Sequence, residues 1–183
     1  MTRVFLGIDL PDNLKFKIEN LVQSQRLNSL PIKLVERGNF HAAIKFLDDL
    51  TDEQIASVIK TVEPIIRIGH QIRIQINDSL VFPNLNFPRV LALKVTSPEL
   101  ISLTQEIINH LDALPFIQPE NRKYTPHITL ARIKDNLTPA EKEKIAGLKF
   151  SDEFNVGSIQ LFKSELTQTG PIYSIIKQFK LNG

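Results

Sequence analysis

The sequence contains no cysteine and only four histidines. The missing thiols exclude disulfide frameworks, thiolate nucleophiles and cysteine-based zinc sites. Histidine, aspartate and glutamate remain as metal ligands, but the histidines show neither His-x-His nor His-Glu-x-x-His spacing. We therefore expect no metal and no other cofactor.

The sequence also lacks a strong charge and a long apolar run. Its formal net charge is only +2, far below that of proteins that bind duplex DNA through a strongly basic arm. Any anionic ligand must therefore be held by local groups. The apolar run at residues 4–8 is too short for a membrane span or a secretory signal, and Asp9 follows it directly. We expect a cytoplasmic protein without membrane contact.

The 183 residues, 42% hydrophobic and 23% charged, have the composition of an ordinary globular domain. Residues 1–183 are predicted to form one domain and to act as a monomer. Alternating or apolar segments predict strands at about 3–9, 32–36, 40–47, 71–76, 89–95, 126–133, 158–161 and 171–180. Pro11 should lie in the first turn of a helix, and Ser97 precedes a helix that should run to about Leu114. Thr51 and Thr138 each begin a predicted capping box at the start of a further helix.

The order of these segments repeats along the chain. Pro11 and Pro98, Thr51 and Thr138, and Ile72 and Ile159 are each separated by 87 residues, and His41 and His127 by 86. We interpret this register as two copies of one β-α-β-α-β plan, at about 1–80 and 88–183, each forming a lobe.

The repeat places the two histidines at equivalent positions on central strands. Since side chains i and i+2 share a face of a strand, His41 should share a face with Ala43, and His127 with Thr129. Two imidazoles across a cleft suit in-line phosphoryl displacement, because one takes a proton from the nucleophile and the other gives one to the leaving oxygen.

Other polar groups near these strands have more than one interpretation. The Thr129 hydroxyl is suited to bind a phosphate oxygen, and Arg132 or Lys45 could offset developing negative charge. Strict alternation, however, puts Arg132 and Phe46 on the opposite face unless the strands bulge, and favours a core position for Phe46. His70 and His110 are interpreted as structural or solvated residues. The segment 81–88 is either an aromatic surface for a base or plain packing.

At these residues the chain resembles the two-histidine (2H) phosphoesterase superfamily, whose signature is a pair of His-x-Thr/Ser motifs. Within it, the sequence is similar to the RNA 2′,3′-cyclic phosphodiesterase family, also called 2′-5′ RNA ligases. The similar segments extend over essentially the whole chain: 5–11, 39–47, 82–83, 88–91, 124–132 and 161–166.

The resemblance implies an α+β, bilobal fold with a pseudo-two-fold duplication, in which two antiparallel sheets face each other across a central groove with helices outside. It implies hydrolysis of RNA 2′,3′-cyclic phosphate ends, or nucleotides carrying them, to 2′-phosphates, with 2′-5′ ligation as the reverse reaction. His41 would be the proton donor and His127 the proton acceptor. Thr129, Arg132, Ala43 and Phe46 would lie at the substrate.

Ala43 departs from the family pattern, which has Thr or Ser two residues after the first histidine. Loss of this hydroxyl removes one hydrogen bond to phosphate. Two alternatives therefore stay open: a nucleotide or phosphate-end binding module with weak or no catalysis, and a phosphodiesterase for another small cyclic phosphate.

Overall fold

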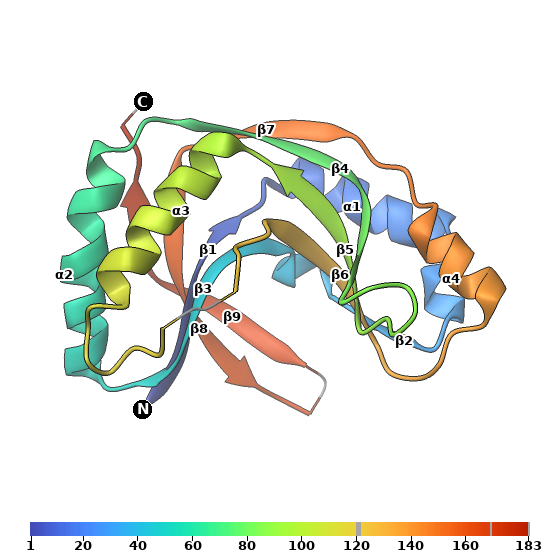
Figure 1. Cartoon of the computed structure of the whole chain (residues 1–183), viewed down its shortest axis with the longest axis horizontal. Coiled ribbons are helices and arrows are strands. Elements are labelled where there is room, and N and C mark those ends of the chain that lie inside the picture. Colours follow the sequence, from blue (N-terminus) through green and yellow to red (C-terminus); the bar gives the residue numbers. More distant parts are fainter. Residues whose placement is uncertain (120–121, 169, 183) are drawn as a thin grey trace.

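The computed structural model describes residues 1–119, 122–168 and 170–182 (Figure 1). The first half contains β1 (Thr2–Asp9), α1 (Asp12–Ser24), η1 (Leu27–Ser29), β2 (Ile32–Leu34), η2 (Arg37–Asn39), β3 (His41–Leu50), α2 (Asp52–Ile68) and β4 (Ile72–Phe82). The second half contains β5 (Val90–Thr96), α3 (Pro98–Leu111), β6 (His127–Ile133), α4 (Pro139–Ala146), β7 (Asp152–Val156), β8 (Ser158–Leu166) and β9 (Pro171–Lys180). The α+β class is confirmed. The strand β7 was not predicted.

The helix starts follow the local sequence. Both predicted capping boxes form: the Thr51 hydroxyl accepts from the N–H of Gln54, and the Thr138 hydroxyl accepts from the N–H of Glu141. Pro11 is the N-cap of α1 and not part of its first turn, since its carbonyl accepts the first helical hydrogen bonds. None of the helices in the described ranges is long and apolar enough to cross a membrane.

The strands form a curled antiparallel sheet in the order β7-β4-β5-β6-β3-β1-β8-β9, with β2 paired to β6. The two predicted sheets are thus joined, through the pairing of Ala42 on β3 with Ile128 on β6. The inner strands are arranged symmetrically about this junction: β5 and β4 follow β6 as β1 and β8 follow β3. However, β4 of the first half pairs with β5, and β8 of the second half pairs with β1. Each half thus contributes two strands to the other lobe, β2 and β4 from the first half and β8 and β9 from the second, which differs from the prediction of one lobe per repeat.

A β-bulge occurs at the same place in each of the two central strands. In the β1–β3 ladder the register passes from Ala43 to Lys45, so that Ile44 has no partner. In the β5–β6 ladder it passes from Thr129 to Ala131, so that Leu130 has none. One extra residue reverses which later side chains point to each face of a strand. The bulges therefore decide which residues accompany the histidines.

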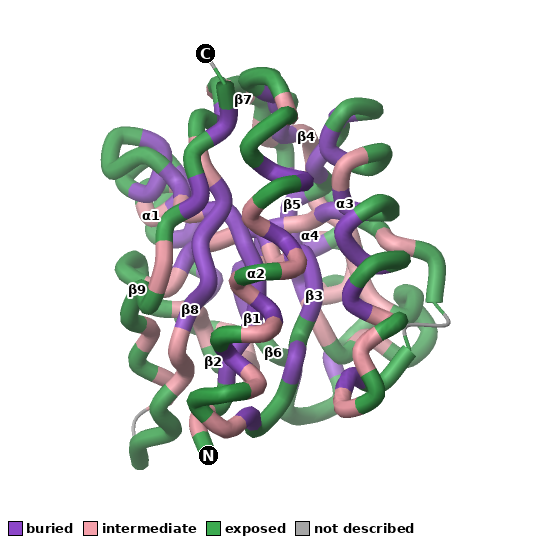
Figure 2. The backbone as a smooth tube through the Cα atoms, turned by 90° about the vertical axis from the view of Figure 1, so that its left-hand side faces the viewer, coloured by how far each residue is buried: buried purple, intermediate pink, exposed green. Residues whose placement is uncertain are grey.

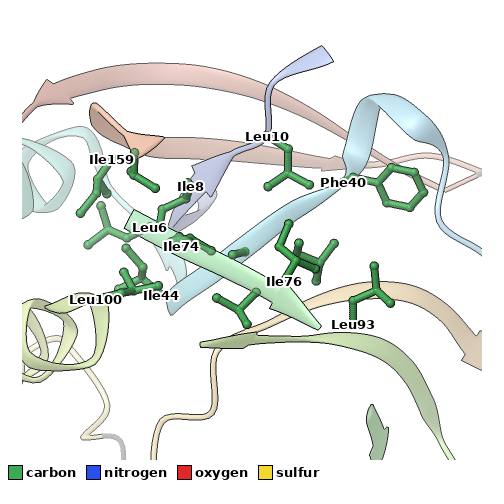
Figure 3. Close-up of a cluster of buried hydrophobic side chains, with 14 of the residues drawn as sticks. Leu6, Ile8, Leu10, Phe40, Ile44, Ile74, Ile76, Leu93, Leu100 and Ile159 are labelled. Carbon is green, nitrogen blue, oxygen red and sulfur yellow. The ribbon is translucent and has the colours of Figure 1, made fainter. Parts of the chain in front are cut away.

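The core lies on the face of the sheet opposite the histidines, between the sheet and the helices. Figure 2 shows buried stretches on the central strands and on the inner sides of α2 and α3. Figure 3 shows side chains from β1, β3, β4, β5 and α3 meeting in this core. Its fully buried members include Leu6, Ile8, Ile74, Ile76, Leu93, Leu100 and Ile159. A continuous apolar layer thus supports the strands that carry the histidines.

Gly7 on β1 permits the close approach of β3 beside His41. A Cβ atom at Gly7 would lie 3.1 Å from the Ala42 carbonyl oxygen and 3.3 Å from the Phe5 ring. We expect Gly7→Ala to lower the free energy of unfolding by roughly 1–3 kcal/mol, because the added methyl overpacks this contact. Urea unfolding measures the change. Gly157→Ala is the matched control, because nothing lies within 4 Å of its Cβ position; equal losses in both variants would contradict the prediction.

Candidate active site

The two histidines have the same local geometry in the two halves. His41 opens β3 and His127 opens β6. The Nδ1 of His41 lies 2.7 Å from the Asn39 carbonyl oxygen, and the Nδ1 of His127 lies 2.8 Å from the Thr125 carbonyl oxygen. A carbonyl accepts only, so each Nδ1 carries a hydrogen and donates it. Nε2 is therefore the nitrogen of each ring that remains for proton transfer.

The histidines lie on adjacent strands, each directly before the residue that joins β3 to β6. The pairing of Ala42 with Ile128 places the two histidines on neighbouring positions of the sheet, and the charge of His127 contributes to lowering the pKa of His41. A hydrogen bond ties the motifs together, since the Tyr124 hydroxyl donates to the Ala43 carbonyl at 3.0 Å. Burial raises the pKa of Tyr124 to about 12, so this donor stays protonated near neutral pH.

Aromatic rings surround His41. The Phe5 ring centroid lies 4.9 Å from that of His41, and Tyr173 packs edge-on at 5.1 Å. Phe162 lies 4.9 Å from Phe5, in a stacked arrangement. His127 contacts one ring, that of Phe82 at 4.7 Å. Phe82 belongs to β4, so the part of segment 81–88 that touches the site is strand and not loop.

The environment of His41 shifts its proton affinity in opposing directions. Burial among these rings lowers its pKa below the ordinary 6.5, because a charged imidazole is poorly solvated there. The hydrogen bond to Asn39 and the carboxylate of Asp9, its partner in the β1–β3 ladder, act to raise the pKa. The charges of His127 and Lys15 act to lower it, and Lys15 also pairs with Asp9 at 2.7 Å. The net direction is downward.

The bulge in β6 places Arg132 on the same face as His127 and Thr129. Thr129 pairs with Ala92 and Arg132 pairs with Val90, two positions of β5 that share a face. Arg132 is exposed, and its charge acts on Tyr173 of β9, where it opposes the rise in pKa that burial causes. The sequence predicted that Arg132 would share the histidine face if the strand bulged, and β6 does bulge between Thr129 and Ala131. Ala43 holds the position beside His41 that Thr129 holds beside His127.

The bulge in β3 has the same effect on Phe46, and the prediction of a core position for Phe46 was wrong. Its side chain is 63% exposed, and its ring lies 5.4 Å from Phe5 on the histidine face. Lys45 takes the core position instead. Its side chain is 3% exposed, its Nζ pairs with the Asp112 carboxylate at 2.8 Å, and it donates to the Gln118 carbonyl. Lys45 is therefore held away from the site.

The other two histidines lie elsewhere. His110 is on α3, where its Nδ1 forms a hydrogen bond with the Glu106 carbonyl oxygen. The backbone of His70 forms an isolated parallel β-bridge with that of Asn182. No cluster of three or more histidine and acidic side chains able to hold a metal ion occurs in the part of the chain that the structure describes. Two surface depressions lie along β4 and β7, at the edge of the sheet away from His41.

Sequence reasoning missed the aromatic residues Phe5, Phe162 and Tyr173. Phe5 stands within the apolar run Val4–Ile8, which gives no sign that one member faces the site. Two charged residues were also missed: Asp9 is the ladder partner of His41, and Lys94 is the ladder partner of His127. A pairing of the predicted strands, with the histidines aligned, would have found both.

The chain is similar to known proteins over almost its whole length. Residues 93–173 match the family model described as LigT like Phosphoesterase. An RNA 2′,3′-cyclic phosphodiesterase of Methanocaldococcus jannaschii is 34% identical over 97% of this chain and 99% of the relative. The chain belongs to the RNA 2′,3′-cyclic phosphodiesterase family, as the resemblance predicted.

Solved structures show the same fold. The protein TT0787 of Thermus thermophilus superimposes with a TM-score of 0.86 at 24% identity, covering 99% of this chain and 98% of that chain. LigT of E. coli, solved in complex with 3′-AMP, gives a TM-score of 0.82 at 21% identity, covering 100% and 99%.

The pKa of His41 provides a test of the site geometry that does not depend on activity. We expect the imidazole of His41 to titrate below 6.5, so that it is mostly neutral at pH 7. His127→Gln removes a titratable group whose positive charge, when His127 is protonated, lowers the pKa of His41, so the His41 midpoint should move upward. NMR of the imidazole carbon-bound protons follows both midpoints. His110→Gln is the control, and a His41 midpoint that responds equally to both substitutions would contradict the proximity.

Proposed function

We propose that this chain hydrolyses 2′,3′-cyclic phosphate ends of RNA to 2′-phosphates without a metal ion. The observation that carries the proposal is the pair of histidines on adjacent strands, both with Nδ1 engaged by a backbone carbonyl and Nε2 left for proton transfer. Family membership and the activity named for the Methanocaldococcus jannaschii relative support the substrate class.

His127 and His41 divide the two proton transfers between them. Nε2 of neutral His127 takes a proton from water as the water oxygen attacks phosphorus. The bond from phosphorus to the 3′ oxygen breaks, and protonated His41 gives its Nε2 proton to that oxygen, leaving a 2′-phosphate. The Asp9 carboxylate supports the donor role of His41, because it favours the charged imidazole that burial disfavours. Proton transfer through water then resets the pair.

The groups beside the histidines bind the substrate. The Thr129 hydroxyl donates to a phosphate oxygen, and Arg132 offsets the negative charge that grows as phosphorus is attacked. Ala43 leaves the matching position on β3 without a donor. Phe46 offers an exposed ring for contact with a base. If a 5′-hydroxyl attacks phosphorus in place of water, the bond to the 3′ oxygen breaks in the same way and a 2′-5′ phosphodiester forms; this ligation is the reverse of cleaving a 2′-5′ bond. We place the reaction in the cytoplasm, with the chain acting as a monomer.

Ala43 also favours a second candidate, a nucleotide or phosphate-end binding module that turns over slowly. Pure binding does not require an acid and a base, so the retention of both histidines favours the enzyme. A phosphodiesterase for another small cyclic phosphate would use the same residues and differ in its preference between RNA ends and small molecules.

Removal of either histidine should abolish most of the activity. With an oligoribonucleotide ending in a 2′,3′-cyclic phosphate, in EDTA, His41→Ala and His127→Ala should each lower kcat by about 10²–10⁴-fold, because each removes one proton transfer. Chromatography identifies the product as the 2′- or 3′-phosphate. His110→Ala should retain full activity, since it lies outside the site. A wild-type activity lost in EDTA and restored by a divalent ion would rule out this mechanism.

Restoring the hydroxyl separates the enzyme from the binding module. Ala43→Thr should raise kcat by about a hundredfold, because the added hydroxyl donates a hydrogen bond to the negative charge that develops in the transition state. The affinity for product should change little. Steady-state kinetics and product titration measure the two effects. Ala43→Val adds similar bulk without a hydroxyl and is the control. Tighter product binding without faster turnover would favour the binding module.

A further inference from the structure

The two strands that carry the histidines meet at a short junction. In the described part of the chain the β3–β6 ladder consists of one pair, Ala42 with Ile128, whereas the neighbouring β1–β3 ladder extends from Thr2 to Asp9. One pair fixes the angle between two strands less firmly than a full ladder, because cross-strand pairs are the unit that stabilises a sheet. Other contacts across the junction are therefore needed to keep the two imidazoles at one spacing.

The Tyr124 hydroxyl supplies one such contact. It donates at 3.0 Å to the carbonyl of Ala43, which lies at the bulge of β3. The Tyr124 ring is partly buried against the hydrophobic core, which restricts where its hydroxyl can point. Between Tyr124 and His127, the Pro126 carbonyl accepts from the N–H of Val95 on β5. The residues directly before His127 are thus attached to the strands on both sides of β6.

Lys45 supplies a second contact from β3. Its side chain enters the core, where Nζ lies 2.8 Å from the Asp112 carboxylate and 3.2 Å from the Gln118 carbonyl oxygen. Asp112 is the C-cap of α3, and Gln118 belongs to the same connection from α3 to β6. Ala43 and Lys45 therefore hold this connection at two points on the strand that begins with His41.

The burial of Lys45 needs a reason other than stability. Its side chain is 3% exposed, and the hydration that it loses offsets much of its attraction to Asp112. Apolar residues in place of a buried ion pair are often neutral or stabilising, so the pair is weak evidence for stability. A buried charge does, however, disfavour every arrangement in which its partner lies elsewhere. The pair is therefore suited to fix where the connection before β6 lies on β3.

We propose that Tyr124 and Lys45 are positioning residues, which hold the connection before His127 against β3 and so keep the two imidazoles at the spacing that proton transfer requires. Both polar groups are engaged by protein atoms, so neither is placed to bind substrate. Positioning of this kind matters, because a displacement of about 1 Å can lower a rate by about a hundredfold. The inference rests on the proposed function and adds to it two residues that act through His127.

Tyr124→Phe tests the first contact, because it removes the hydroxyl and keeps the ring. With a 2′,3′-cyclic phosphate substrate it should lower kcat by about 10–100-fold and leave KM unchanged, since only the spacing of acid and base is altered. The matched control is Ser79→Ala, which removes a hydrogen bond of the same 3.0 Å length from a hydroxyl to a backbone carbonyl, that of Ala146 at the end of α4. The control should keep the wild-type kcat.

Lys45→Met with Asp112→Asn tests the second contact. Both charges are removed, because Lys45→Met alone would take away the counter-charge of Asp112 in the core. This double variant should lower kcat by about tenfold at unchanged KM. Its control is Lys177→Met with Glu63→Gln, which removes an ion pair of the same 2.8 Å length between β9 and α2. Urea unfolding of every variant shows that the kinetics are those of folded protein.

The spacing itself is followed through the NMR titration of His41. His127→Gln should raise the His41 midpoint, and the size of this response depends on how close the two rings lie. The response should be smaller when Tyr124→Phe or the Lys45 and Asp112 variant is present, because the effect of one charge on another weakens with distance. The other titratable groups around His41 are unchanged in all of these proteins: Asp9 on β1, Lys15 on α1 and Tyr173 on β9.

The outcomes separate this inference from the proposed function. If wild type is active and the variants of Tyr124 and Lys45 keep both its kcat and its His41 response, their role is merely structural and the proposed function stands. A lower kcat with an unchanged His41 response would also overturn the inference. If wild type is inactive, the proposed function fails, and the His41 response then decides the inference without any measurement of activity.

Discussion

The β-bulges at Ile44 in β3 and at Leu130 in β6 determine what the site contains. Side chains alternate along a strand, so without the bulge at Leu130 the Arg132 side chain would enter the core, and without the bulge at Ile44 the same would hold for Phe46. The change of parity also turns Lys45 inward. A buried cation is tolerated only with a partner, and Asp112 supplies it. The bulge in β3 thus turns Phe46 toward the histidine face and, as a consequence, requires an acidic partner for Lys45 in the core.

The two halves share a backbone plan but not a chemistry. Equivalent positions carry Ala43 and Thr129, Phe46 and Arg132, and ladder partners Asp9 and Lys94. The lobe around His41 is aromatic with one adjacent carboxylate, and the lobe around His127 is polar and basic. A symmetric pair of imidazoles would have no preferred direction of proton transfer. The surrounding substitutions provide one.

The sequence predicted most of what local rules control. The capping boxes at Thr51 and Thr138, the final strand 171–180, the equivalence of the histidines and the sides taken by Ala43 and Thr129 were all readable from short-range patterns. The exchange of β4 and β8 between halves was not readable, because pairing partners far apart in the chain are set by the closed arrangement of the whole sheet. The bulges were foreseen only as a condition, since nothing in Ile44 or Leu130 marks an unpaired residue. Phe46 was therefore misplaced, and the ring of Tyr173 on an edge strand was overlooked.

The exchange of strands has a mechanical consequence. Each lobe contains two strands from the other half of the chain, so a movement of one half of the chain away from the other would have to separate β4 from β5 and β1 from β8. Such ladders open together or not at all. The two imidazoles, however, lie on β3 and β6, the strands at which the lobes meet through the pairing of Ala42 with Ile128. The spacing of the imidazoles therefore depends on this short junction, while the exchanged strands keep each lobe rigid around its own histidine.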